Sequence, residues 1–151
     1  MFVDTYALRG AGESLEILAL RRSSQGGGRC PGSWETIHGT IEPGETPVQA
    51  SLRELREETG LVPAKFYNLS RTEAFYQHRT DEVALIPVFA AFVAPTATVT
   101  VSAEHDRAEW LPARAAAQRF AWPRERRAVE DILSIVGGGD AGLLEDVLRV
   151  K

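Results

Sequence analysis

The chain has 151 residues, a length that fits one domain with its own hydrophobic core. Hydrophobic residues make up 44% and charged residues 25%, ordinary values that exclude a disordered or fibrous protein. The net charge of −4 argues against holding a nucleic acid polymer on a broad basic surface. The single cysteine and the lack of a secretory signal pattern favour a cytoplasmic setting, and no segment is apolar enough to cross a membrane. We therefore expect one soluble domain over residues 1–151.

The first part of the sequence predicts strands separated by turns and loops. Residues 2–8 and 15–21 read as two strands, and the second is apolar on both faces, which is typical of a strand inside a sheet. The loop 23–33 contains a run of glycines at 26–28 and is either a lid or a tolerated insertion. It is not a phosphate-binding P-loop, because no Gly-Lys-Ser/Thr follows it. Residues 34–38 then read as a short strand.

The segment 46–59 carries the strongest helix signal of the chain. Thr46 suits the N-cap, Pro47 suits the first helical position and Gln49 completes a capping box. Gly60 suits the left-handed conformation that ends many helices. Apolar residues recur at helical spacing within the segment at Val48, Leu52 and Leu55. The sequence therefore predicts an amphipathic helix here.

The second part of the sequence predicts further strands followed by helices. The strands are expected at 66–77, 83–93 and 108–111, and the helices at 113–119, 124–135 and 143–150. The last helix follows a glycine run at 137–139, so residues 137–151 are interpreted as a C-terminal helical tail. Strands on both sides of a helix in the sequence favour an α/β sandwich.

The polar side of the 46–59 helix carries three glutamates that share one face. Glu54, Glu57 and Glu58 stand at positions i, i+3 and i+4, so their carboxylates lie near one another. Like charges at these spacings repel by a few tenths of a kcal/mol per pair, and a hard divalent cation would reverse that effect. The alternative is a solvated surface neutralised by Arg53 and Arg56.

The sequence around these glutamates decides between the two interpretations. Residues 39–61 read GTIEPGETPVQASLRELREETGL, which resembles the signature of Nudix hydrolases: glycine, five residues, glutamate, seven residues, then Arg-Glu-aliphatic-x-Glu-Glu-x-Gly-aliphatic. Every constrained position agrees: Gly39, Glu45, Arg53, Glu54, Leu55, Glu57, Glu58, Gly60 and Leu61. A chance match has a probability on the order of 10⁻¹⁰ at a given start position. The resemblance implies an α/β/α sandwich with a mixed sheet and Mg²⁺-dependent cleavage of diphosphate linkages.

The same resemblance implies roles for individual residues. The expected ligands of Mg²⁺, or of Mn²⁺, are Gly39 through its carbonyl, Glu54, Glu57, Glu58 and Glu104. Arg53 is expected to pair with Glu57 or with Glu45 and so to orient the carboxylates. The candidate general bases are Glu54 within the signature and Glu104 in a late loop, where a plain surface glutamate is the alternative.

Shorter pieces resemble one Nudix subgroup, the dihydroneopterin triphosphate pyrophosphatases and dATP pyrophosphohydrolases of bacteria. These pieces are 17–22, 33–35, Glu104-His105, 109–111, Trp122 and 126–128. Arg21 or Arg22 is a candidate for binding a polyphosphate, with a solvent-facing strand end as the alternative. Trp34 is a candidate for stacking on a base or pterin ring, with an ordinary core tryptophan as the alternative.

Three functions remain open from the sequence. The first is hydrolysis of a nucleoside or pterin triphosphate to a monophosphate and pyrophosphate. The second is another Nudix activity, on oxidised nucleotides, nucleotide sugars or dinucleoside polyphosphates. The third is a non-catalytic domain that senses a nucleotide. In each case the partner is a small phosphorylated molecule, and the resemblance also allows a homodimer.

Overall fold

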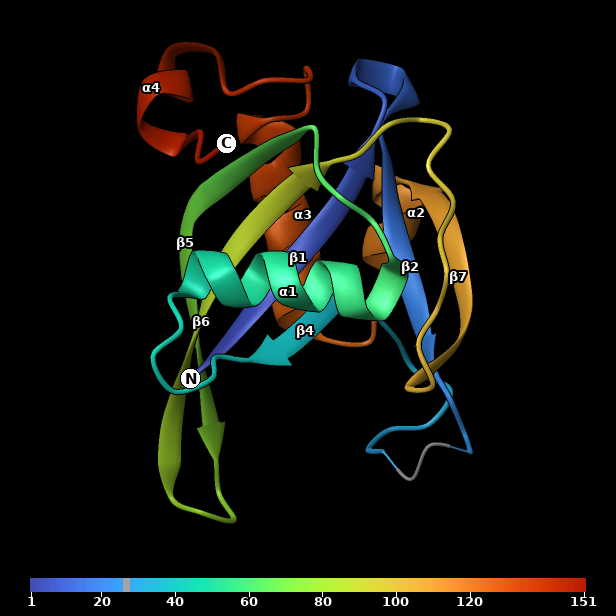
Figure 1. Cartoon of the computed structure of the whole chain (residues 1–151), viewed down its shortest axis with the longest axis vertical. Helices are drawn as coiled ribbons and strands as arrows, with labels where there is room; N and C mark the ends of the chain where they lie inside the picture. The colour runs from blue at the N-terminus through green and yellow to red at the C-terminus, as the bar shows by residue number, and fades with distance from the viewer. Residues whose placement is uncertain (26–27) are drawn as a thin grey trace.

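The computed structural model describes residues 1–25 and 28–151 (Figure 1). Within that part of the chain, one mixed sheet contains seven strands, with β1 and β6 parallel and the other pairs antiparallel. The strands are β1 (Phe2–Arg9), β2 (Glu16–Arg22), β3 (Trp34–Glu35), β4 (Ile37–Thr40), β5 (Lys65–Gln77), β6 (Glu82–Phe92) and β7 (His105–Pro112). Their order is β3-β2-β1-β6-β5, with β4 also paired to β1 and β7 to β2.

Helices cover both faces of this sheet (Figure 1). On one face lies α1 (Pro47–Thr59), whose Ala50 and Leu55 pack into a core with apolar side chains of the sheet. On the other face lie α2 (Ala113–Arg119) and α3 (Pro123–Ile135), which form a second core with the opposite sides of the strands. The two separate cores confirm the expected α/β/α sandwich.

The capping signals of α1 act as the sequence predicts. The Thr46 hydroxyl accepts a hydrogen bond from the Gln49 amide at 3.2 Å, and the Gln49 side chain accepts one from the Thr46 amide at 2.9 Å. Gly60 ends the helix with φ +73°, and its amide donates to the Arg56 carbonyl at 2.8 Å. The cap settles where the helix begins and ends, and therefore which way its glutamates face.

The prediction of a single strand at 34–38 is wrong, because this segment divides at Thr36 into two strands. β3 pairs with β2, whereas β4 pairs with β1. Buried Thr36 donates its amide to Glu125 Oε2 at 2.5 Å and its hydroxyl to the Thr5 carbonyl at 2.6 Å. These bonds replace the ladder bonds that a continuous strand would make.

The helix expected at 143–150 is also shorter than predicted. A 3₁₀ turn, η2 (Gly142–Leu144), leads into α4 (Glu145–Leu148). The chain then leaves the helix because Val150 donates its amide to the Phe66 carbonyl at 2.8 Å, beside β5. Tyr67 of β5 also donates its hydroxyl to Glu145 at 3.0 Å. The segment after the glycine run is therefore attached to the sheet.

A further 3₁₀ turn, η1 (Gly12–Ser14), joins β1 to β2. The proposed lid or insertion at the glycine run 26–28 rests on Gly26 and Gly27, which lie outside the described residues. In the ranges 1–25 and 28–151, no helix is long and apolar enough to cross a membrane.

Candidate active site

The acidic face of α1 contains a buried carboxylate that lacks a partner. Glu58 is only 4% exposed, and within the described part of the chain its Oε2 atom has no hydrogen-bond partner. Burial, together with the nearby charges of Glu54 and Glu104, raises the pKa of Glu58 well above its ordinary value. Burial and the neighbouring acids also raise the pKa of Glu54, although Arg53 opposes this shift. The site therefore concentrates negative charge that the protein alone does not neutralise.

The backbone of β4 passes directly against this face. A Cβ atom added at Gly39 would lie 2.1 Å from Cδ of Glu54, which is impossible without displacing the glutamate. The glycine of the signature is therefore needed for close approach of strand and helix. In the loop that follows, Gly44 has φ +81°, which supplies the backbone freedom expected there.

Arg53 is the organising group of the acidic face. Its guanidinium makes two hydrogen bonds to the two oxygens of Glu45, each 2.9 Å long. It also donates to Glu54 at 2.7 Å, to Glu57 at 3.2 Å and to the Thr40 carbonyl at 2.9 Å. Both pairings expected from the sequence, with Glu57 and with Glu45, are therefore present at once.

Glu104 lies beside the acidic face although it is distant in the sequence. The loop that carries it is tied to the end of α1, because Thr100 donates to the Thr59 carbonyl at 2.9 Å and Ser102 donates to the Glu58 carbonyl at 3.2 Å. Glu104 itself is exposed, and its charge is among the causes of the raised pKa of Glu58. The structure thus brings all the glutamates that the sequence selected into one region.

The oxygen donors of the acidic face suit a divalent cation, although their side chains do not yet converge on one point. Across residues 1–25 and 28–151, no three acidic, histidine or cysteine side chains already converge as a closed metal cage. One reason is visible: Glu54 is turned toward the Arg53 guanidinium. The unpartnered Oε2 of Glu58, in a cluster of carboxylates, is nevertheless the kind of oxygen donor that Mg²⁺ prefers.

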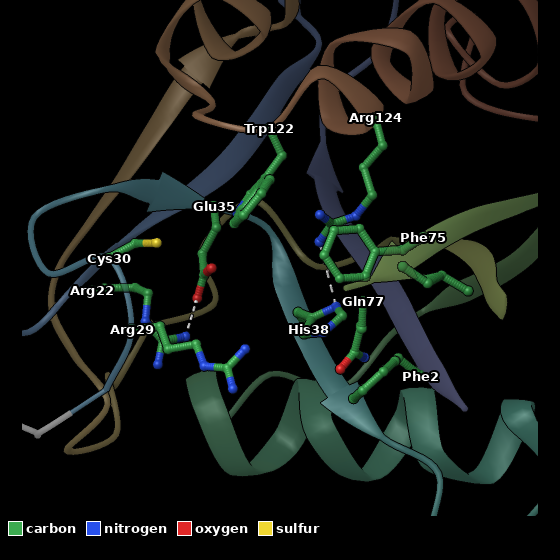
Figure 2. Close-up of a pocket in the computed structure, with 11 residues that line it drawn as sticks. Phe2, Arg22, Arg29, Cys30, Glu35, His38, Phe75, Gln77, Trp122 and Arg124 are labelled. Carbon is green, nitrogen blue, oxygen red and sulfur yellow. Dashed lines mark hydrogen bonds and ion pairs between the residues drawn. The ribbon is translucent and has the colours of Figure 1, made fainter. Parts of the chain in front are cut away.

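A pocket of about 240 Å³ lies next to this region, and one of its ends is charged (Figure 2). Arg22, Arg29 and Glu35 line that end, with Cys30 beside them. Glu35 is 6% exposed and accepts hydrogen bonds from Arg22 at 2.9 Å and from Nε2 of His105 at 3.0 Å. Two arginines, one of them held by a buried carboxylate, therefore face the cavity.

The other end of the pocket is aromatic. Phe75 and Trp122 meet edge to face with ring centroids 6.3 Å apart, and Phe2 stacks on His38 at 5.2 Å. Figure 2 shows Trp122 between this end and Glu35. The polar side chains here, Gln77 and Arg124, give the aromatic end a small set of hydrogen-bonding groups.

Charged side chains of the pocket act on the acidic face. The charges of Glu35 and Arg22, which line the pocket, both act on the pKa of Glu58, the first raising it and the second lowering it. Strand β4 also links the two regions, because His38 lines the pocket while the next residue, Gly39, contacts Glu54. The charged end of the pocket and the acidic face are therefore neighbours in the structure.

The structure separates the substrate-binding candidates chosen from the sequence. Arg22 lines the pocket, but Arg21 turns to the outside and pairs with Asp106 at 2.7 Å. Trp34 does not line the described pocket either. It packs against the core on the α2 and α3 side, with the Arg119 guanidinium 4.7 Å from its ring. The reason is strand alternation: Trp34 and its neighbour Glu35 point to opposite faces, and the glutamate faces the pocket.

Several residues of the pocket were not selected from the sequence as site residues. Trp122 and Glu35 appear there only within short pieces of family resemblance, and Phe75 and Arg124 carry no signal at all. Asp4 offered an unused signal, because an acidic residue inside an apolar strand pattern needs a buried partner. In the structure it has two, His38 at 2.6 Å and Arg124 at 2.8 Å.

Comparisons with known proteins give the family. The family model described as "NUDIX domain" matches residues 3–132. An octanoyltransferase of Myxococcus xanthus is 33% identical over 129 residues, which are 85% of this chain and 35% of that protein. The chain thus spans about a third of that relative's length.

Two solved structures have the same fold. An Ap4A hydrolase of C. elegans has a TM-score of 0.73 at 19% identity, covering 91% of this chain and 97% of that chain. The dihydroneopterin triphosphate pyrophosphohydrolase of E. coli has a TM-score of 0.68 at 23% identity, covering 87% of this chain and 94% of that chain. Since the family match spans most of the sequence and includes the complete signature, this chain belongs to the Nudix family.

Proposed function

We propose that this enzyme hydrolyses a nucleoside or pterin triphosphate to the monophosphate and pyrophosphate, using Mg²⁺ or Mn²⁺. The observation that carries the proposal is the position of the acidic face beside a pocket with one charged and one aromatic end. A ring at the aromatic end and phosphates toward the carboxylates would span the two regions. The short sequence pieces shared with dihydroneopterin triphosphate pyrophosphatases support the same substrate class.

The aromatic end suits a flat ring. Stacking of a base on an aromatic side chain contributes about 1–3 kcal/mol per base, and Trp122 and Phe75, which pack edge to face, both line the cavity. The cavity volume is about 240 Å³.

The charged end suits the phosphates. Guanidinium groups form paired hydrogen bonds to phosphate oxygens, and Arg22 and Arg29 both face the cavity. Arg22 is prevented from turning away by its hydrogen bond to Glu35, which His105 holds in turn. The chain of contacts would position Arg22 between the ring and the acidic face.

Hydrolases of this family generally use divalent ions such as Mg²⁺. In this chain the carbonyl of Gly39 and the carboxylates of Glu54, Glu57, Glu58 and Glu104 would hold the ion. When bound, the ion would neutralise charge on the diphosphate and make a water molecule easier to deprotonate. Arg53 keeps the carboxylates of Glu54 and Glu57 oriented.

The proton of the attacking water needs an acceptor. Glu104 is the leading candidate because it is exposed and lies beside the acidic face. Glu54 is the alternative, although its carboxylate is already engaged by Arg53. Replacing each by glutamine and comparing the pH dependence of kcat would separate the two roles.

The test is a substrate panel with Mg²⁺, in which phosphate and pyrophosphate are assayed separately. The panel contains dATP, GTP, dihydroneopterin triphosphate, an oxidised nucleotide, a nucleotide sugar and a dinucleoside polyphosphate. Pyrophosphate from a triphosphate, lost in Glu57→Gln and kept in the control Glu130→Gln on the exposed side of α3, is the expected result. Cleavage confined to nucleotide sugars or dinucleoside polyphosphates would contradict the proposal. Tight binding without turnover would indicate a nucleotide-sensing domain.

A further inference from the structure

A buried network of charged groups lies behind the aromatic end of the pocket. Asp4 stands on the central strand β1 and is 1% exposed, yet it carries an acidic side chain. Burial alone would raise the pKa of Asp4, but the hydrogen bond from His38 and the charge of Arg124 hold it below its ordinary value. The carboxylate is therefore ionised inside the protein.

Stability gives little reason for such a group. Two charges removed from water recover their desolvation cost only with very good geometry, and apolar residues of similar volume often serve the fold as well. Here the carboxylate accepts from Nδ1 of His38 at 2.6 Å and from Nε of Arg124 at 2.8 Å. Both partners line the pocket. The network therefore holds two polar side chains in place at the aromatic end.

Arg124 keeps donor capacity for a ligand. Its Nε faces one oxygen of Asp4 and its Nη2 faces the other at 3.5 Å. Within residues 1–25 and 28–151, its third nitrogen, Nη1, donates no hydrogen bond. Figure 2 shows the guanidinium reaching from α3 toward the centre of the pocket, beside Phe75 and above His38. An arginine fixed in this way presents donors and no acceptor to the edge of a ring.

We infer that Arg124, anchored on Asp4, makes the enzyme select substrates whose ring presents a carbonyl oxygen at this edge. Guanine and pterins carry such an oxygen, whereas adenine carries an amino group in its place. A guanidinium donates well to a ring carbonyl and an adjacent ring nitrogen, but it meets an amino group donor to donor. This inference rests on the proposed function and narrows its substrate to oxo-substituted rings.

Steady-state kinetics with four triphosphates test the selectivity. GTP and ITP carry the ring carbonyl, while ATP and 2,6-diaminopurine riboside triphosphate carry an amino group there. We expect kcat/KM to be about 10-fold or more higher for the first pair, with the difference mainly in KM. Because ITP lacks the second amino group of GTP, it isolates the contribution of the carbonyl. Equal or better turnover of ATP would overturn the inference.

Two variants assign the selectivity to Arg124. Arg124→Lys leaves Asp4 a cationic partner but removes the planar fork, so the ratio of kcat/KM for GTP over ATP should fall toward one. The double variant Asp4→Asn, Arg124→Met removes both charges together, which avoids leaving a buried carboxylate unpaired. Arg114→Met, at an exposed position of α2, is the matched control. Folded variants that keep the wild-type ratio would contradict the inference.

Binding of monophosphates separates this inference from the proposed function. GMP, IMP and AMP can be titrated calorimetrically whether or not any triphosphate is cleaved. If cleavage fails but GMP and IMP bind more tightly than AMP, and Arg124→Lys removes that preference, the proposed function is wrong and the selectivity stands. If cleavage fails and the three bind equally or not at all, the selectivity is overturned as well.

Discussion

The acidic face of α1 and the neighbouring pocket are built in different ways. The face comes from one helix, where the spacing of Glu54, Glu57 and Glu58 alone brings carboxylates together. The pocket gathers side chains from β1 to β6, the loop before β3 and the start of α3. The difference teaches that the groups proposed for cleavage are local in the sequence, whereas the groups proposed for recognition are brought together only by the fold.

The two regions also differ in how their charges are balanced. Two buried carboxylates beside the pocket, Asp4 and Glu35, have cationic or histidine partners. On the acidic face, Glu58 has an Oε2 atom with no partner in the described structure. The pocket side chains are therefore held in place by the protein alone, whereas the acidic face keeps an unpartnered oxygen for the cation proposed to bind there.

The largest effect is expected from Glu58→Gln. Loss of one carboxylate from the cation site should lower kcat/KM at least about 100-fold, because a bound ion contributes several kcal/mol to the transition state. Without metal the fold disfavours the ionised form of Glu58, and glutamine removes that cost, so the free energy of unfolding at pH 8 should rise by on the order of 1 kcal/mol. Kinetics and urea unfolding of the same samples measure both. If the variant without metal is less stable than wild type, the proposed difference between the unpartnered Glu58 and the partnered carboxylates of the pocket is wrong.

A smaller loss is expected from Arg53→Lys. Lysine keeps the positive charge but cannot bind both oxygens of Glu45 while also reaching Glu54 and Glu57. Groups that orient metal ligands typically contribute about 10–100-fold, and we expect kcat/KM to fall within that range. Apparent Mg²⁺ affinity should fall in parallel. Activity equal to wild type at low Mg²⁺ would show that the orientation of these carboxylates does not matter.

For the pocket, Trp122→Ala should change binding rather than chemistry. Loss of one stacking surface predicts a rise in KM of about 10-fold, with kcat within about threefold of wild type. The matched control is Trp34→Phe, which changes a tryptophan that packs outside the pocket. A large fall in kcat with unchanged KM would contradict the assignment of binding to the pocket and of chemistry to the acidic face.

The last expected effect is on stability rather than on catalysis, and it concerns the buried carboxyl of Glu125, beside the pocket. Burial raises the pKa of Glu125 to about 8, above the ordinary value of 4.5, so the fold favours its protonated form. Its contribution to stability is present below pH 4.5 and is lost as the pH rises toward 8, at a rate of at most about 1.4 kcal/mol per pH unit.

The comparison is between wild type and Glu125→Gln. Asp4, Glu35 and Arg124 lie near this carboxyl in both proteins, so their own titration largely cancels. Urea unfolding at pH 5.5 and 8.5 should therefore show wild type losing more stability than the variant. A difference that does not change with pH would indicate that Glu125 is not protonated in the fold.

Much of the acidic face could be predicted from the sequence, for physical reasons. Helix caps and i, i+3, i+4 spacing depend on residues close in the chain, so α1, its glutamates and the pairing of Arg53 with Glu57 fit local patterns. The family resemblance supplied Glu104, which local patterns could not.

The pocket could not be predicted in the same way. The segment 34–38 forms two strands instead of the expected one, because the amide of Thr36 donates to Glu125 of α3, which is distant in the sequence. Trp34 was selected as an aromatic residue near the signature, but strand alternation directs Glu35 into the pocket instead. Trp122 enters from α3, far along the chain.

The central claim is that one molecule occupies the pocket and the acidic face together. Its most direct test is calorimetric titration of GTP and of dihydroneopterin triphosphate, with Mg²⁺, into Glu57→Gln and into Glu57→Gln, Trp122→Ala. We predict that at least one triphosphate binds the uncleaving single variant and that the second substitution weakens this binding about 10-fold. Equal affinity in the two proteins would show that the substrate reaches the carboxylates without using the pocket, and the account would be wrong.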